Sequence, residues 1–267
     1  MANISFDDHL FHPSSFSKLI TEPRLKADKE AGKLSETTKT YLRTVYREVK
    51  YKRKSTFESK YTNKGLVVED DGITLFCRLK KQLYKKNTVR IDNHFLTGEP
   101  DLSDNEDVMK CEHGVDIKCP WSLFTFPFPD DELELSYWWQ NQCYMYLTGA
   151  KKWSTAYCLM NAPGDEILQE KKKVYYKLGM PEEGYPTYDA YIEKCLQIER
   201  NMIFNKSEFI EQNPGWDWDC KVWEYDIPLK ERLVEFTVER NEEAISKIQS
   251  TVIKCRNYLN ELNDLFK

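Results

Sequence analysis

Two neighbouring strand patterns that carry acidic and basic residues constrain the fold of this 267-residue chain most strongly. Residues 88–95 alternate apolar and polar side chains, and residues 114–119 form a second short run of the same kind. Asp101 follows the first pattern at a proline-marked bend, and the second pattern contains Asp116 and Lys118. Because side chains at positions i and i+2 share one face of a strand, Asp116 and Lys118 should project together. We expect Asp101 to meet them across the sheet.

Two carboxylates and one amine that converge in this way suit a hard divalent cation. Magnesium prefers oxygen ligands and keeps several of its waters, so Asp101, Asp116 and the backbone carbonyl of Ile117 are candidate ligands. Manganese is an alternative metal for the same oxygen ligands. A metal ion there polarises a phosphoryl group and lowers the pKa of a bound water, while Lys118 can orient the water or neutralise charge. The pattern therefore predicts a site for phosphodiester hydrolysis.

The remaining patterns place this site in an α/β chain. Helical periodicity or a helix start signal is found in five segments: residues 14–24, 37–54, 66–83, 131–149 and 229–267. Two further segments have the apolar runs typical of strands: residues 153–160 and 173–178. The order of helices, then strands crossed by a helix, then helices predicts a mixed central β-sheet flanked by helices, with N-terminal and C-terminal helical additions.

Charge and cysteine usage exclude several other classes of protein. The net charge of −5 argues against a nucleic-acid binder that uses its whole surface, but residues 1–60 hold 13 Lys and Arg against 8 Asp and Glu and can attract phosphates. The eight cysteines show no CxxC spacing, so we expect buried, reduced thiols and neither zinc nor an iron–sulfur cluster. No apolar run approaches the roughly 18 residues of a membrane helix, and no signal peptide begins the chain, so we expect a cytoplasmic protein without membrane contact.

The segments around the two aspartates resemble a known nuclease signature. Residues 98–101, Gly-Glu-Pro-Asp, and residues 115–120, Val-Asp-Ile-Lys-Cys-Pro, resemble the motif of the PD-(D/E)xK nuclease superfamily. The final Lys-Cys-Pro resembles the phage lambda exonuclease-like branch, in which glutamate more often stands where this chain has Asp116. The resemblance implies a restriction-endonuclease-like core and a Mg²⁺-dependent exonuclease that hydrolyses duplex DNA from its ends in phage-type recombination or repair. It also implies one nuclease domain (1–267) with three parts: an N-terminal helical part (1–87), a catalytic sheet and helix (88–160), and C-terminal strands and helices (161–267).

Two further segments resemble motifs of the same family. Residues 65–69 resemble a helix motif in which a glutamate four residues after a glycine faces the metal ions, so Glu69 is a candidate catalytic residue and metal ligand. Residues 137–144 resemble the helix that follows the catalytic strand in lambda-type and RecB-type nucleases. Gln140 and Tyr144 lie four residues apart and share a helix face. Gln140 would hold the attacking water or the phosphate, and Tyr144 would contact DNA.

The segment of residues 14–24 is similar to a lambda-type segment in which a serine and an arginine bind the 5′-phosphate of the DNA end. Ser14 and Arg24 are the matching residues, and the fork of an arginine can hold two phosphate oxygens. Glu99 departs from the family pattern, because a carboxylate in place of a small hydroxyl residue would repel that phosphate. Five basic residues in or after the next predicted helix would extend the positive surface: Arg43, Arg47, Lys50, Lys52 and Arg53.

The residues leave other activities open. A structure-specific or restriction-type endonuclease uses the same core, and so does a RecB-like or CRISPR-adaptation nuclease, although the latter usually binds an iron–sulfur cluster through four cysteines. A non-catalytic DNA-binding protein could keep the fold, but the complete set of site residues favours an enzyme. By resemblance, the partners of such a phage- or prophage-encoded enzyme would be double-stranded DNA, a single-strand annealing protein and further copies of the chain in a trimer.

Overall fold

The computed structural model of this chain describes residues 4–55, 60–219 and 222–265. Its larger sheet has the strand order β1-β4-β5-β6-β7. The sheet is mixed, because β5 and β6 are parallel whereas the other neighbours are antiparallel. The strands are β1 (Lys85–Lys86), β4 (Leu102–Ser103), β5 (His113–Lys118), β6 (Lys152–Cys158) and β7 (Leu233–Glu239). The predicted α/β class with a mixed central sheet is therefore confirmed.

Strand β5 lies in the middle of this sheet and carries the predicted catalytic pattern. Its first five residues are buried, as expected for a strand that is covered on both faces. In the antiparallel pairing with β4, Val115 lies opposite Leu102. Continuing that register by one residue sets Asp116 opposite Asp101, and facing positions of an antiparallel pair have Cβ atoms about 5 Å apart. The register of two short strands thus brings the two aspartates together.

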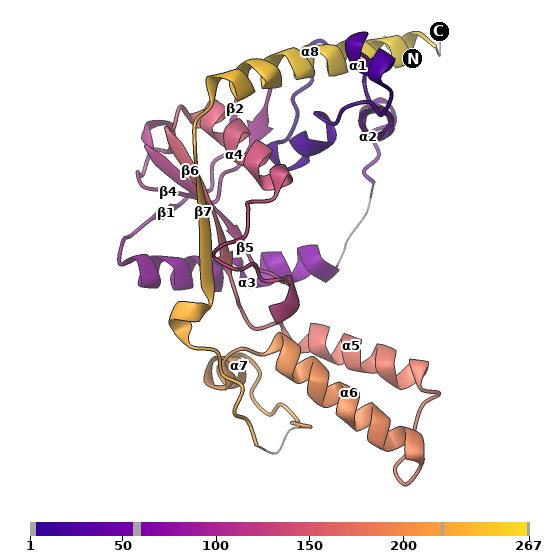
Figure 1. Cartoon of the computed structure of the whole chain (residues 1–267), viewed down its shortest axis with the longest axis vertical. Coiled ribbons are helices and arrows are strands. Elements are labelled where there is room, and N and C mark those ends of the chain that lie inside the picture. Colours follow the sequence, from indigo (N-terminus) through magenta and orange to yellow (C-terminus); the bar gives the residue numbers. More distant parts are fainter. Residues whose placement is uncertain (1–3, 56–59, 220–221, 266–267) are drawn as a thin grey trace.

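Helices cover both faces of the sheet (Figure 1). Helix α3 (Lys60–Lys80) packs on one face against β5 and β6, and α4 (Leu135–Thr148) packs on the other. The layer outside α4 is completed by η1 (Pro13–Lys18), α2 (Glu36–Tyr51) and α8 (Glu242–Asp264). Each face has its own hydrophobic core, so the site residues at the end of β5 are held from both sides.

Two glycines allow close approach to the central strand. A Cβ atom on Gly72 of α3 would lie 3.0 Å from Sγ of Cys119 and 3.1 Å from Cγ2 of Ile117. A Cβ atom on Gly114 of β5 would lie 2.2 Å from the ring of Trp153, which is fully buried. Gly72 weakens the helix by its low propensity, but its missing side chain lets α3 lie directly on β5.

A helical hairpin projects from the sheet region (Figure 1). It consists of α5 (Gly164–Lys177) and α6 (Pro186–Met202), with α7 (Lys206–Gln212) at its base. A small core of Ile167, Phe209 and their neighbours holds this base. The remaining short elements are α1 (Lys26–Glu30), β2 (Ile91–Asp92), β3 (Thr97–Gly98), η2 (Val108–Lys110), η3 (Leu123–Thr125) and η4 (Leu229–Glu231).

Most predicted elements occur in the structure. The predicted helices and strands that are confirmed correspond to α2, α3, α4, β5 and β6. The predicted helix of residues 14–24 is only the short 3₁₀ helix η1. Residues 88–95 contain only the two-residue strand β2, because the side chain of Asn93 accepts hydrogen bonds from the amides of Phe95 and Leu96 at 2.9 Å each and turns the chain.

Two predictions in the C-terminal part are wrong. Residues 173–178 belong largely to α5 and form no fourth strand, because Ile167 and Lys171, one helical turn apart, bury one face of this helix. The predicted helix of residues 229–267 begins instead with η4 and β7, and only α8 is helical over its full length. Strand β7 pairs with β6 along seven residues, and its own residues, rich in Val, Thr and Phe, favour a strand.

Membrane-spanning potential and the cysteines complete the description. Among the described residues, no helix combines the length and the apolar character needed to cross a membrane. Seven cysteines in the described part of the chain are free thiols, and five of them are buried. The eighth, Cys220, lies outside the described residues.

Candidate active site

The two predicted aspartates lie side by side at the end of β5. The carboxylate of Asp101 accepts a hydrogen bond from the backbone amide of Ile117 at 2.8 Å. Asp116 is 2% exposed and points to the face of β5 that α4 covers. Burial, and next the charge of Asp116, raise the pKa of Asp101 to about 8, although Lys118 and the Ile117 amide lower it. Two carboxylates here therefore hold more negative charge than their surroundings neutralise.

Lys118 is paired with the buried aspartate. Its Nζ lies 2.5 Å from Oδ2 of Asp116, and a quarter of its side chain is exposed. Burial alone would lower the pKa of Lys118, but the carboxylates of Asp116 and Asp101 outweigh burial and raise the pKa to about 12. Lys118 is therefore positively charged at neutral pH and reaches from the buried site toward solvent.

Gln140 holds the same aspartate from the opposite side. Its Nε2 donates a hydrogen bond to Oδ1 of Asp116 at 2.8 Å, and the Gln140 side chain is buried in α4. This amide was predicted to hold an attacking water or a phosphate. In the structure it donates to Asp116, and Gln140 is not among the residues that line the cavity described below. Gln140 positions Asp116.

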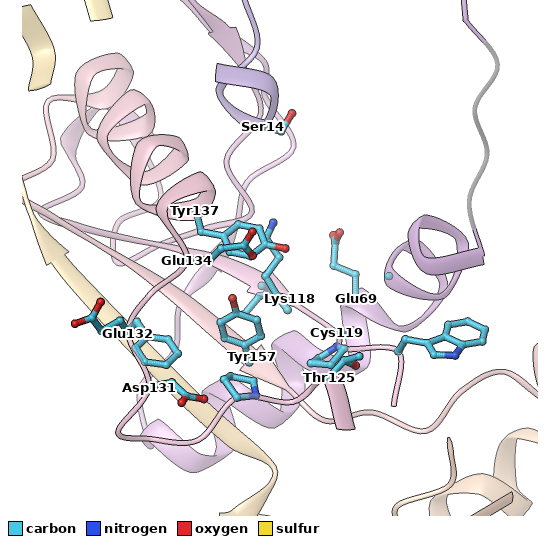
Figure 2. A pocket seen from close by; sticks show the side chains of 16 residues that line it. Ser14, Glu69, Lys118, Cys119, Thr125, Asp131, Glu132, Glu134, Tyr137 and Tyr157 are labelled. Carbon is cyan, nitrogen blue, oxygen red and sulfur yellow. The ribbon is translucent and has the colours of Figure 1, made fainter. Parts of the chain in front are cut away.

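A cavity of about 940 Å³ opens beside the end of β5. Figure 2 shows Glu69 of α3 on one side of it, Tyr137 and Tyr157 on the other, and Lys118 between them. One oxygen of Glu69, Oε1, lies 3.4 Å from Nζ of Lys86. Its charge nevertheless contributes to the raised pKa of Asp101. The cavity thus exposes Lys118 and Glu69, with the two aspartates behind them.

The carboxylate pair fits a magnesium ion by its chemistry. Oδ2 of Asp116 is buried and accepts no well-directed hydrogen bond within the described part of the chain, apart from its ion pair with Lys118. Added positive charge next to this buried oxygen and the Asp101 carboxyl group, whose pKa is raised, would be stabilised electrostatically. No three Asp, Glu, His or Cys side chains of the described residues converge as metal ligands. Magnesium needs no such set, since it is bound by one or two carboxylates and keeps several waters.

The residues predicted to bind the DNA end are divided between two places. Ser14 of η1 is exposed and lines the cavity. Arg24 is exposed just before α1. The end of this segment lies near α8, since a Cβ atom on Gly32 would lie 3.7 Å from Nζ of Lys254. Figure 1 shows α1 beside the C-terminal part of α8, away from β5. Among the described residues, the cavity lining includes neither Arg24 nor the five predicted basic residues of Arg43, Arg47, Lys50, Lys52 and Arg53.

Tyr144 is part of the protein interior. It is 6% exposed, stacks on Trp153 with ring centres 5.2 Å apart, and donates a hydrogen bond to the carbonyl of Glu99 at 3.3 Å. Burial raises its pKa. The structure therefore corrects its assignment as a DNA contact. The carboxylate of Glu99 has its own partner, because Arg90 lies 3.5 Å away and offsets the negative charge that would repel a phosphate.

Sequence analysis missed two kinds of site residue. Asn87 fixes the bend that carries Asp101, because its backbone amide donates to the Asp101 carbonyl at 2.8 Å and its side chain donates to the Pro100 carbonyl at 3.0 Å. Tyr137 and Tyr157 line the cavity beside Lys118. No local pattern marks these roles, because each depends on strand pairing that joins distant segments.

Comparisons with known proteins agree with the fold described above. No family model matches the chain, and no curated protein matches it. The structure is similar to that of a phage related exonuclease from Haemophilus somnus 129PT, with a TM-score of 0.67, 25% sequence identity, and coverage of 97% of this chain and 96% of that chain. It is also similar to the alkaline exonuclease LHK-Exo from Laribacter hongkongensis, with a TM-score of 0.58, 10% identity, and coverage of 97% and 92%. LHK-Exo in complex with dAMP gives a TM-score of 0.58 at 11% identity over 97% and 91%.

Proposed function

We propose that this chain, whose structure is of the lambda exonuclease-like PD-(D/E)xK type, is a Mg²⁺-dependent exonuclease that degrades duplex DNA from its ends. The observation that supports this most is the cluster at the end of β5. Asp101 and Asp116 face one another there, with Lys118 ion-paired to Asp116 and reaching the cavity. The protein does not fully neutralise the negative charge of the two carboxylates, so they can bind a divalent cation. The charged lysine beside them can bind a phosphate.

The residues of the cluster have separable tasks in hydrolysis. When bound, the metal ion would polarise the scissile phosphate and lower the pKa of an attacking water. Asp101 and Asp116, with the carbonyl of Ile117, would hold it. Lys118 keeps its positive charge at neutral pH, so it stabilises negative charge that develops on the phosphate and can orient the water.

Buried hydrogen bonds keep the carboxylates in place for this task. Gln140 occupies Oδ1 of Asp116, and the Ile117 amide occupies Oδ2 of Asp101. Each aspartate therefore has one oxygen held by an amide donor, and the second oxygen of Asp116 is paired with Lys118. Such outer partners commonly change metal affinity or activity by 10- to 100-fold when they are removed.

Glu69 and Ser14 would act at the rim of the cavity. Glu69 would bind or orient a water of the metal ion, since its carboxylate lines the cavity. Ser14 would contact a terminal phosphate, for which its exposed hydroxyl is available. By resemblance we further propose a role in phage-type recombination or repair with a single-strand annealing partner; the description of one similar structure as a phage related exonuclease supports only the phage-type context.

The test compares linear duplex DNA with the same sequence as a covalently closed circle. With Mg²⁺ the purified protein should release nucleotides from the linear form and leave the circle intact, and EDTA should stop the reaction. Cleavage of the closed circle would instead assign an endonuclease. The absence of any cleavage, together with salt-dependent DNA binding, would assign a non-catalytic binding protein.

A further inference from the structure

One wall of the cavity is built from aromatic rings that begin beside Lys118. The aromatic wall consists of Tyr137 of α4, Tyr157 of β6 and Phe236 of β7. Tyr137 and Tyr157 meet edge to face with ring centres 6.0 Å apart, and Tyr157 and Phe236 do so at 5.9 Å. Nζ of Lys118 lies 5.1 Å from the centre of the Tyr137 ring, and Lys118 is the register partner of Tyr157 in the β5–β6 pairing.

The aromatic wall is only partly exposed, and acidic residues surround it. Asp131, Glu132 and Glu134 also line the cavity, and we call these three residues the acidic rim. Glu134 lies near enough to Tyr137 and Tyr157 for its charge to contribute to the raised pKa of both phenols, after burial. Figure 2 shows Glu134 next to Tyr137, on the side of the cavity opposite Glu69.

Charge divides this cavity into two parts. Among the described residues that line it, Lys118 is the one cation; Glu69 is a carboxylate on the α3 side, and the acidic rim carries three more. A phosphate is therefore attracted to the Lys118 end and repelled from the acidic rim. A nucleobase has the opposite preference, because it is uncharged, stacks on aromatic rings, and can donate hydrogen bonds from an amino group to a carboxylate.

We infer that the aromatic wall is a nucleobase subsite, which receives the base of the terminal nucleotide once that base has left the duplex, while the phosphate of the nucleotide lies at Lys118. This inference rests on the proposed nuclease function and adds a specificity to it. Cytosine, adenine and guanine present amino groups with two N–H donors to the acidic rim, whereas thymine has one ring N–H, which lies between two carbonyl oxygens that a carboxylate repels. The subsite therefore binds these three bases in preference to thymine.

The test measures binding of the four deoxynucleoside 5′-monophosphates and of deoxyribose 5-phosphate by calorimetry. With wild type, dAMP, dCMP and dGMP should bind more tightly than dTMP, and about tenfold more tightly than deoxyribose 5-phosphate, because stacking on aromatic side chains contributes strongly to affinity. Tyr157→Leu should lower the affinity for dAMP about tenfold and leave that for deoxyribose 5-phosphate unchanged. Tyr157→Phe keeps the ring and should bind dAMP like wild type.

Two further variants sharpen the result. Glu134→Leu removes a carboxylate of the acidic rim and should narrow the difference between dAMP and dTMP. Tyr176→Leu is the matched control, because Tyr176 is a tyrosine of α5 that is 67% exposed and outside the cavity lining. It should bind all five probes like wild type.

Three outcomes distinguish failure of this inference from failure of the proposed function. If wild type degrades linear duplex but binds dAMP no better than deoxyribose 5-phosphate, the subsite is refuted and the nuclease stands. If Tyr157→Leu binds dAMP as tightly as wild type, the aromatic wall is likewise refuted. If wild type fails to cleave DNA in Mg²⁺ while the base-dependent binding is present, the nuclease function alone is refuted.

Discussion

Replacing Gln140 by methionine tests whether a buried hydrogen bond positions the catalytic carboxylate. Gln140 and Gln142 are both buried in α4, and each donates one hydrogen bond at 2.8 Å. The acceptor is the Asp116 carboxylate for Gln140 and the Glu239 carbonyl for Gln142. Methionine has nearly the same volume, so Gln142→Met is the control for Gln140→Met; Gln142 also accepts a hydrogen bond from the Asn241 amide at 2.9 Å, and its variant therefore loses two neutral hydrogen bonds.

The structure sets the expected magnitudes. A hydrogen bond to a charged group contributes about 1.5–3 kcal/mol, and a neutral one about 0.5–1.5 kcal/mol, with a further cost for an acceptor left unsatisfied. The free energy of unfolding should therefore fall by about 1–3 kcal/mol in both variants. Only Gln140→Met frees Oδ1 of Asp116, so only this variant should lose about 10- to 100-fold in magnesium affinity and in cleavage rate.

The assay combines urea unfolding, calorimetric titration with Mg²⁺, and single-turnover cleavage of linear duplex at saturating DNA. The reasoning is refuted if Gln142→Met loses as much activity as Gln140→Met, because the effect would then come from disturbed packing of α4. It is refuted equally if Gln140→Met binds magnesium and cleaves like wild type.

Three further predictions follow from single contacts. Lys118→Met removes the charge beside the phosphate and should slow single-turnover cleavage by about 10²–10³-fold, while calorimetry should show magnesium affinity unchanged or higher; a collapse of metal binding would make Lys118 structural. Burial lowers the pKa of Lys64 to about 7, against 10.5 in the unfolded chain, so the unfolded state binds more protons between these values and stability should rise with pH. From pH 7 to 8.5 the free energy of unfolding of wild type should rise by about 1.5 kcal/mol more than that of Lys64→Met in urea titrations, and equal slopes would contradict this. Wild type should degrade 5′-phosphorylated ends faster than unphosphorylated ends; Ser14→Ala should weaken this preference, whereas Arg24→Ala, outside the cavity, should keep it. Equal rates of wild type on both ends would remove the end-binding role of Ser14.

The central strand was predictable because its signal is local. Period-2 alternation sets Asp116 and Lys118 on one face, and the 2.5 Å ion pair is the direct result. The meeting with Asp101 was also predictable, because Asp101 follows the preceding strand pattern at a proline-marked bend. The hydrogen-bond partner of Gln140 could not be predicted. Helical periodicity shows which face of α4 is buried, but not which residue of β5 each side chain of α4 meets.

Strand β7 was predicted as helix although its own sequence contains a strand signal. Residues 233–239 alternate apolar and polar side chains, and the cap of α8 is Asn241, whose side chain accepts a hydrogen bond from the Ala244 amide at 2.9 Å. These features mark a strand that ends before a helix begins. Residues 229–267 contain no glycine or proline that would mark a break. The helical periodicity of the residues that form α8 was therefore extended over the strand.

The cavity walls depend on pairing that no segment reveals by itself. Tyr157 lies beside Lys118 only because β5 and β6 pair in parallel in one register. Arg24 was predicted to lie near Ser14 from their spacing of ten residues. The spacing does not fix the path of the chain, which turns toward α8 after η1 ends.

The most direct test of the central claim is the rate at which Asp116→Asn cleaves a linear duplex in saturating Mg²⁺. Asparagine keeps the size of the side chain and removes its charge, so the account predicts a loss of more than about 10³-fold. DNA binding at low salt and the unfolding midpoint should change little, and Asp71→Asn, on α3 and outside the main cavity, should cleave like wild type. Cleavage by Asp116→Asn within a few-fold of the wild-type rate would contradict the assignment of this cluster as the catalytic site.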